Sequence, residues 1–138
     1  GLGDNTLRRR LAERMRVNWH TAVHPSAWVG RGVVLGEGTV VLAGAVLNAD
    51  AAVGAHCIIN TGAIIEHDCG VGAYTHISPR ATLCGTVSVG KEVHIGAGAV
   101  VRNNLRICSY TVVGAGGVVV RYIIEPGTYV GNPVRRLR

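Results

Sequence analysis

The sequence is dominated by an aliphatic residue that recurs at every sixth position, without a break in frame. These positions are Val23, Val29, Leu35, Val41, Leu47, Val53, Ile59, Ile65, Val71, Ile77, Leu83, Val89, Ile95, Val101, Ile107, Val113 and Val119. A period of six fits neither an amphipathic helix, which repeats every 3.6 residues or so, nor a long alternating strand. It predicts short strands, each ended by a turn, with one branched side chain pointing inward per hexad.

The remaining hexad positions favour a stack of coils. The residue after the aliphatic one is often Gly, and the fifth residue of the hexad is usually small. A small residue lets the chain bend at a corner without a clash, and Gly tolerates unusual backbone angles. Stacked coils would then form parallel sheets around a continuous aliphatic core.

Composition agrees with a narrow core in one domain. The chain has 138 residues with 20 Gly and no Phe. Its cysteines form no CxxC pair, so we expect them to be reduced, buried small residues; they are Cys57, Cys69, Cys84 and Cys108. No apolar run reaches the roughly 18 residues that span a bilayer, and no signal-peptide pattern is present. We therefore expect a cytoplasmic protein without a membrane span.

The net charge of +6 comes from arginines near the two ends. No aromatic residues alternate with them, which argues against a nucleic-acid partner. We interpret the first group as a solvated helix face and the last as a group that could meet a small phosphate-bearing ligand. The two groups are Arg8, Arg9, Arg10, Arg14 and Arg16, and Arg135, Arg136 and Arg138.

The segment before the repeats predicts a short helix. Asp4 or Asn5 can cap its start. Leu7, Leu11 and Met15 follow at steps of four and give the helix one apolar stripe.

Three motifs within the repeats narrow the family: INTG at residues 59–62, EHDC at residues 66–69 and YTHIS at residues 74–78. With the hexads, they resemble the hexapeptide-repeat acyltransferases, in the bacterial group of sialic acid O-acetyltransferases and nucleotide-linked 4-amino-sugar N-acetyltransferases. The resemblance implies an all-β fold, a left-handed parallel β-helix of 18-residue coils with a short N-terminal helix. It also implies acetyl-CoA as co-substrate, no metal, and a homotrimer with active sites between subunits.

The same resemblance suggests how the chain is divided. GLGDN at residues 1–5 is similar to the last strand and turn of the family's α/β domain, which holds the sugar nucleotide. Residues 1–22 are thus expected to be a remnant of that domain, comprising strand end, helix and linker. Residues 23–138 are expected to form the β-helix acyltransferase domain with a C-terminal cap.

His67 and His76 are nine residues apart, half of an 18-residue coil. They would lie on different sides of one prism and could meet only across an interface between two chains. The resemblance makes His67 the general base, a role suited to an imidazole near neutral pH. It makes Asp68 the acidic partner of that base; Glu66 could serve instead, and Asn60 is expected to orient the acceptor.

The resemblance also implies an acetyl-CoA site. His76 matches a histidine that hydrogen-bonds acetyl-CoA near the thioester, and His94, one coil later, is interpreted as a surface residue. The other expected cofactor-binding residues are Gly85, Ala97, Gly98, Ala115 and Arg135.

The predicted function is transfer of an acetyl group from acetyl-CoA to an amino or hydroxyl group of a sugar, in bacterial glycan biosynthesis. We expect a nucleotide-linked 4-amino sugar as acceptor; sialic acid O-acetylation and a non-catalytic β-helix scaffold are the alternatives. Zinc carbonic anhydrases share the fold, but Gly62 stands where their earlier histidine ligand belongs, which argues against a metal site.

Overall fold

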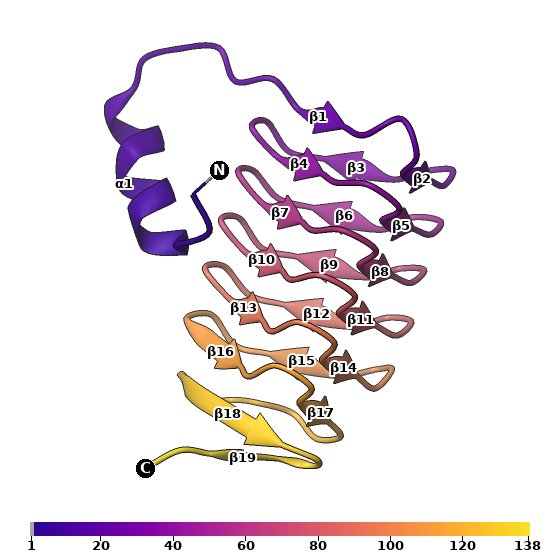
Figure 1. Ribbon diagram of the computed structural model, residues 1–138, viewed down its shortest axis with the longest axis vertical. Coiled ribbons are helices and arrows are strands. Elements are labelled where there is room, and N and C mark those ends of the chain that lie inside the picture. The colour runs from indigo at the N-terminus through magenta and orange to yellow at the C-terminus, as the bar shows by residue number, and fades with distance from the viewer. Residues whose placement is uncertain (1) are drawn as a thin grey trace.

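A computed structural model describes residues 2–138, so the predicted role of Gly1 lies outside the described residues. The chain winds into a three-sided prism, with helix α1 (Asn5–Arg14) along one side (Figure 1). Sheet A consists of β1 (Ala22–Val23), β4 (Val40–Val41), β7 (Ile58–Ile59), β10 (His76–Ile77), β13 (His94–Ile95), β16 (Thr111–Val113), β18 (Gly127–Gly131) and β19 (Val134–Arg136). Sheet B consists of β2 (Trp28–Val29), β5 (Val46–Leu47), β8 (Ile64–Ile65), β11 (Thr82–Leu83), β14 (Val100–Val101) and β17 (Val118–Val119). Sheet C consists of β3 (Val34–Leu35), β6 (Ala52–Val53), β9 (Gly70–Val71), β12 (Ser88–Val89) and β15 (Arg106–Ile107).

The coils have the predicted length of 18 residues. His76 pairs in parallel with Ile58 in the preceding coil and with His94 in the following coil. Each strand therefore stacks on the strand three elements earlier, and residues 18 apart form columns that run along the prism. The antiparallel pair β18 and β19 ends the stack at the C-terminus (Figure 1).

The hexad aliphatics form the core, as predicted. Leu47, Ile59, Ile65, Ile77 and Leu83 are fully buried. The small residues at the corners are buried too, and some of them satisfy backbone groups inside the prism: the hydroxyl of Thr75 donates to the carbonyl of Gly90 at 2.8 Å and accepts from Val93 N–H at 3.1 Å. In the first coil the inward-facing Val23 and Val29 are exposed, because no coil lies beyond them.

The four cysteines are free, in agreement with the sequence prediction. Cys57 and Cys69 are buried at corners, where their thiols donate to the carbonyls of Gly72 and Cys84, each at 3.2 Å. Burial raises the pKa of Cys57 to about 11, which makes it a poor nucleophile at neutral pH.

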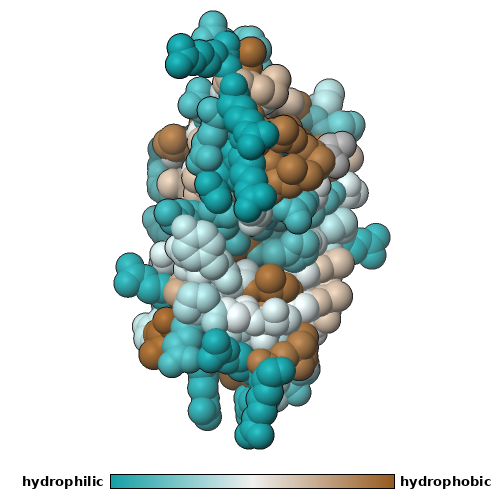
Figure 2. All heavy atoms as spheres, turned by 90° about the vertical axis from the view of Figure 1, so that its left-hand side faces the viewer, coloured by the Kyte–Doolittle hydropathy of each residue, from teal (hydrophilic) through white to brown (hydrophobic). Residues whose placement is uncertain are grey.

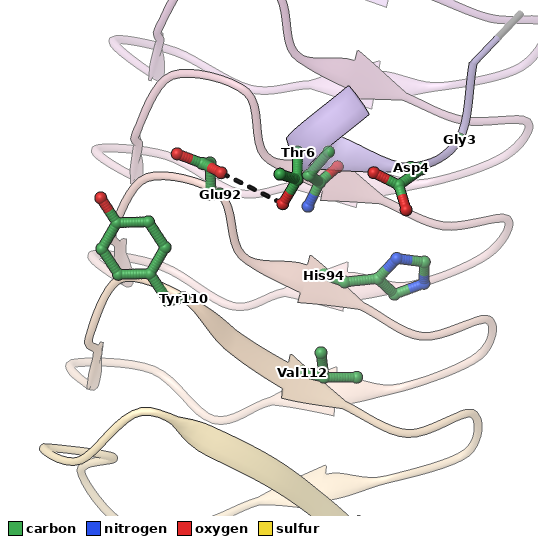
Figure 3. A pocket seen from close by; sticks show the side chains of 8 residues that line it. Gly3, Asp4, Thr6, Glu92, His94, Tyr110 and Val112 are labelled. Carbon is green, nitrogen blue, oxygen red and sulfur yellow. Dashed lines mark hydrogen bonds between the residues drawn. The ribbon is translucent and has the colours of Figure 1, made fainter. Parts of the chain in front are cut away.

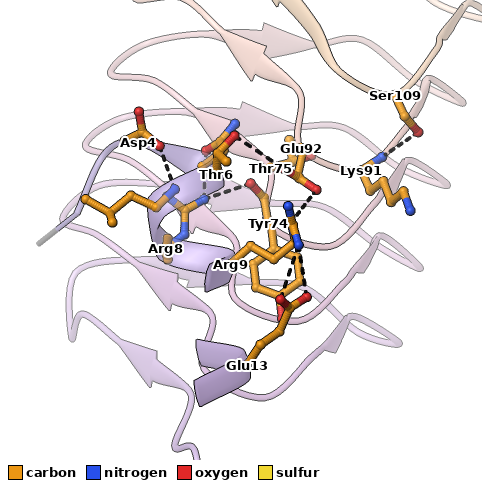
Figure 4. A network of polar contacts seen from close by, with 12 residues as sticks. Asp4, Thr6, Arg8, Arg9, Glu13, Tyr74, Thr75, Lys91, Glu92 and Ser109 are labelled. Carbon is orange, nitrogen blue, oxygen red and sulfur yellow. Dashed lines mark hydrogen bonds and ion pairs between the residues drawn. The ribbon is translucent and has the colours of Figure 1, made fainter. Parts of the chain in front are cut away.

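Helix α1 is capped as predicted, since the Asp4 carboxylate accepts from Leu7 N–H at 2.7 Å. It is held to the prism by arginines (Figure 4). Arg8 donates to the carbonyls of His56 and Tyr74, both at 2.8 Å, and Arg9 forms an ion pair with Glu92 at 2.8 Å. The prediction that these two arginines belong to a solvated face is therefore wrong, because the carbonyls and the carboxylate at one corner of the prism bind them.

The apolar stripe of α1 is exposed instead. Leu7, Leu11 and Met15 all retain much of their solvent-accessible surface, and Ala12 is the buried residue of the helix. Figure 2 shows the helix as a hydrophilic ridge beside an apolar patch. The predicted origin of residues 1–22 in another domain stays a prediction, and the first strand begins at Ala22.

Because the aliphatic columns hold the coils together, truncating one of them should destabilise the whole stack. We expect Leu83→Ala to lower the free energy of unfolding by about 2–5 kcal/mol, the usual cost of a core cavity. Ile124 is 78% exposed, so Ile124→Ala should change it by less than about 0.5 kcal/mol. Urea denaturation at one fixed protein concentration measures both; equal effects of the two substitutions would contradict this account of the core.

Candidate active site

His67 and Asp68 form a pair at the corner between sheets B and C. They occupy the turn between β8 and β9, where His67 Nδ1 lies 2.8 Å from Asp68 Oδ2. Both side chains are 58% exposed. A carboxylate bonded to Nδ1 holds the imidazole in the tautomer whose Nε2 is unprotonated. The reactive nitrogen of His67 is therefore Nε2.

The backbone explains why Asp68, and not Glu66, is the partner of the imidazole. Asp68 has a left-handed backbone with φ of 58°, a conformation that Asp tolerates better than most residues. This places its short side chain beside the preceding histidine. Glu66 instead lies 3.4 Å from the His67 backbone N–H. The choice that the sequence left open between the two carboxylates is resolved in favour of Asp68.

His76 lies on sheet A, away from the corner that holds His67, as their half-coil separation predicts. Asn60 Oδ1 accepts from Thr61 N–H at 2.8 Å, so its Nδ2 is the atom that faces His76 Nε2 at 3.0 Å. His76 Nε2 must then accept, and the neutral ring carries its proton on Nδ1. Within residues 2–138, His76 Nδ1 is buried without a hydrogen-bond partner.

A second pair repeats this arrangement one coil later. Ser78 Oγ lies 3.0 Å from His94 Nε2, and Ser78 and His94 follow Asn60 and His76 by 18 residues each. The two imidazoles meet edge to face with centroids 4.9 Å apart. The interpretation of His94 as a surface residue is thus wrong. The 18-residue spacing of both residues was the signal that could have indicated the pair.

His94 also lines a hollow of about 290 Å³ between the start of α1 and sheet A. Figure 3 shows Thr6 facing Glu92 across this hollow, at 3.5 Å, with His94 and Val112 on the strands next to them. Gly3 lies over the neighbouring His76, which is only 8% exposed.

Both imidazoles on sheet A favour the neutral form. Burial lowers the pKa of His76 to about 4, and the nearby His94 lowers it further in the same direction. Burial also lowers the pKa of His94, with a smaller effect from the Arg8 guanidinium. His76 is therefore a neutral hydrogen-bond donor at physiological pH, which distinguishes it from the exposed, carboxylate-paired His67.

The predicted cofactor residues Ala97, Gly98 and Ala115 lie together at the corner between sheets A and B. Ala97 and Ala115 are stacked and exposed, and Gly116 N–H donates to the carbonyl of Ala97 at 2.8 Å. Gly98 has φ of 66°, and no atom lies within 4 Å of the place where its Cβ would be. This corner is smooth and open.

The other two predicted cofactor residues lie elsewhere. Gly85 is at the corner between sheets B and C, against the ring of His67. Arg135 lies on β19 and lines a hollow of about 200 Å³ together with Tyr122 and Tyr129. Arg136 is bound to Glu125 at 2.9 Å, which leaves Arg135 as the more available cation.

Two further searches cover residues 2–138. They contain no cluster of three or more histidine, cysteine, aspartate or glutamate side chains that could hold a metal ion. No helix in this range is long and apolar enough to cross a membrane.

Comparisons with known proteins place this fold. No family model matches the sequence. The solved structure of PerB from Caulobacter crescentus, in complex with CoA and GDP-perosamine, has a TM-score of 0.97 and 44% identity, over 99% of this chain and 68% of that one. The chain belongs to the hexapeptide-repeat sugar acetyltransferases. Its predicted left-handed parallel β-helix is thereby confirmed.

Other members of the family agree. The acetyltransferase domain of PglB from Neisseria gonorrhoeae has a TM-score of 0.96 and 37% identity, over 99% of this chain and 68% of that one. A UDP-N-acetylbacillosamine N-acetyltransferase from Bacillus subtilis is 49% identical over 45 residues, which are 30% of this chain and 21% of that protein. The chain thus spans about two thirds of its solved relatives, and its match to the Bacillus protein covers about a fifth of that protein.

The low pKa of His76 has a consequence for stability in acid. In the unfolded chain the imidazole has its ordinary pKa of about 6.5, and in the folded chain about 4. The unfolded state therefore binds more protons as the pH falls from about 6.5 to 4, and stability that is fully present above pH 6.5 or so is lost over that range.

We expect the free energy of unfolding to fall less steeply between pH 7 and 5 in His76→Gln than in the unsubstituted protein. Urea denaturation at a series of pH values measures the slope. His20→Gln, at an exposed histidine, is the matched control and should run parallel to the unsubstituted protein. Parallel curves for His76→Gln would contradict the buried, neutral state of this ring.

Proposed function

We propose that this acetyltransferase moves the acetyl group of acetyl-CoA to the amino group of a nucleotide-linked amino sugar, with His67 as general base. The observation that carries the proposal is the His67–Asp68 pair on an exposed corner, with Nε2 free to accept a proton. The names of the relatives support the substrate class, because PerB is solved with CoA and GDP-perosamine.

The proposed reaction uses the two nitrogens of His67 differently. As the acceptor amine attacks the thioester carbonyl carbon, Nε2 takes one proton from the amine, and Asp68 stabilises the imidazolium that forms. The C–S bond then breaks, and the proton on Nε2 passes to the departing thiolate. The products are the N-acetylated sugar and free CoA.

The positions of the other predicted residues are compatible with a cofactor groove. The open corner of Ala97, Gly98 and Ala115 would let the thin pantetheine arm lie against the backbone. Arg135 would meet its phosphates. The buried Nδ1–H of His76 is an unpaired donor, which supports a hydrogen bond to acetyl-CoA at the level of that ring.

We further propose a homotrimer in which the His67 corner of one subunit faces sheet A of the next. The argument is the half-coil separation, which places His67 and His76 on different sides of one prism. Cyclic assembly of identical subunits would bring the two sides together three times.

The function is tested by incubating the chain with acetyl-CoA and a panel of acceptors, following free thiol and confirming products by mass. The panel contains GDP- and UDP-linked 4-amino sugars and sialic acid. We expect turnover with an amino sugar. Turnover only with sialic acid would favour O-acetylation, and binding of acetyl-CoA without any turnover would favour a scaffold.

His67→Ala should lower kcat by about a hundred- to ten-thousand-fold, the usual contribution of a general base. Thermal stability and the dissociation constant for acetyl-CoA should change little, because the side chain is exposed on a turn. His20→Ala is the control. Near-normal turnover of His67→Ala with a verified acceptor would exclude this residue as the base.

Asp68→Asn should lower kcat less than His67→Ala does, because it weakens the base without removing it. The amide keeps the size of the side chain and loses the charge that stabilises the imidazolium. Steady-state kinetics with the same acceptor measure both variants; a larger loss in Asp68→Asn would contradict the assigned order of roles.

A further inference from the structure

The ring of His67 lies against the next coil of the prism. The turn of residues 85–86 stacks on the turn of residues 67–68, and Thr86 N–H donates to the carbonyl of His67 at 2.9 Å. Gly85 is the residue directly beyond His67 in this column. The column also contains Arg31, Ala49 and Asn103, each of which carries a side chain.

A side chain at position 85 would occupy the space of the imidazole. A Cβ built on Gly85 would lie 2.6 Å from His67 Nε2 and 2.8 Å from Cε1. Carbon atoms in contact are normally about 3.5–4.0 Å apart, so even a methyl group would displace the ring. The atom that would be struck first is Nε2, the nitrogen that is free to accept a proton.

We propose that Gly85 is a positioning residue for His67: its lack of a side chain lets the imidazole lie over the adjacent coil while Nδ1 stays on Asp68. The inference deepens the proposed function and depends on it for its catalytic meaning. It differs from the cofactor contact that the sequence resemblance implies for Gly85, since it acts through the ring of His67.

The fold itself does not require Gly at this position. Gly85 is not among the residues with a left-handed backbone, so an alanine could adopt its conformation without strain. The ring that it would displace is at the end of an exposed side chain and can rotate into solvent. An alanine should therefore move the imidazole and leave the prism intact.

Gly85→Ala tests this inference, with Gly70→Ala as the matched control. Gly70 lies on β9 in the coil that carries His67; its backbone is not left-handed, and no atom lies within 4 Å of the place of its Cβ. In Gly85→Ala we expect kcat to fall roughly ten- to a hundred-fold, as misplaced catalytic groups do, with KM for acetyl-CoA and the thermal midpoint unchanged. In Gly70→Ala we expect all three values to be unchanged.

The position of the ring is measured separately, by NMR of the imidazole ¹⁵N and ¹H nuclei, assigned with His67→Ala. We expect the signals of His67 to shift in Gly85→Ala and to stay in place in Gly70→Ala. Unchanged His67 signals in Gly85→Ala would overturn the inference, whatever the turnover. An increase in KM for acetyl-CoA with kcat unchanged would also overturn it, in favour of a cofactor contact.

The two proposals can fail independently. If the unsubstituted protein transfers acetyl groups to no acceptor but the His67 signals shift in Gly85→Ala, the positioning role stands and the proposed function fails. If the protein is active and Gly85→Ala keeps normal kcat, the proposed function stands and the positioning role fails.

Discussion

The aliphatic core in 18-residue coils is the constraint on which the rest of the structure depends. An inward side chain must stack on its equivalent in the coils before and after it, and the backbone hydrogen bonds fix that register. A shift by one residue would turn each buried aliphatic residue outward. Every outward position is thereby also fixed in a column, and the functional residues occupy these columns.

Columns explain how chemistry can be added without disturbing the core. His67 and Asp68 lie on a turn, outside the aliphatic stack, and Gly85 is their neighbour because it is 18 residues further on. Asn60 and His76 form a pair on sheet A that recurs as Ser78 and His94 one coil later. The first pair fixes the tautomer of His76, whereas the carboxylate of Asp68 fixes that of His67.

Much of this arrangement could be predicted from the sequence, because a strict period determines both the core and the columns. The strands, the 18-residue coil, the separation of His67 from His76 and the stacking of Ala97 on Ala115 all follow from counting. The choice of Asp68 over Glu66 could not be predicted, since it depends on the left-handed backbone of Asp68.

Contacts between the helix and the prism could not be predicted either, because they join segments outside the repeat. The hydrogen bonds of Arg8 to the carbonyls of His56 and Tyr74 determine which side of α1 faces the prism, and its apolar stripe is left exposed. The burial of His76 depends on the same N-terminal segment, through Gly3.

The central claim is that half a coil separates the two halves of the active site, so that each site needs two subunits. Mixed trimers test it most directly: His67→Ala and His76→Ala subunits carrying different affinity tags are co-expressed, and trimers with both tags are isolated. Each variant alone should be impaired, and the mixed trimers should regain turnover, because an intact His67 can face an intact His76 across one interface. Mixed trimers as inactive as the less active of the two variants would contradict a site shared between subunits.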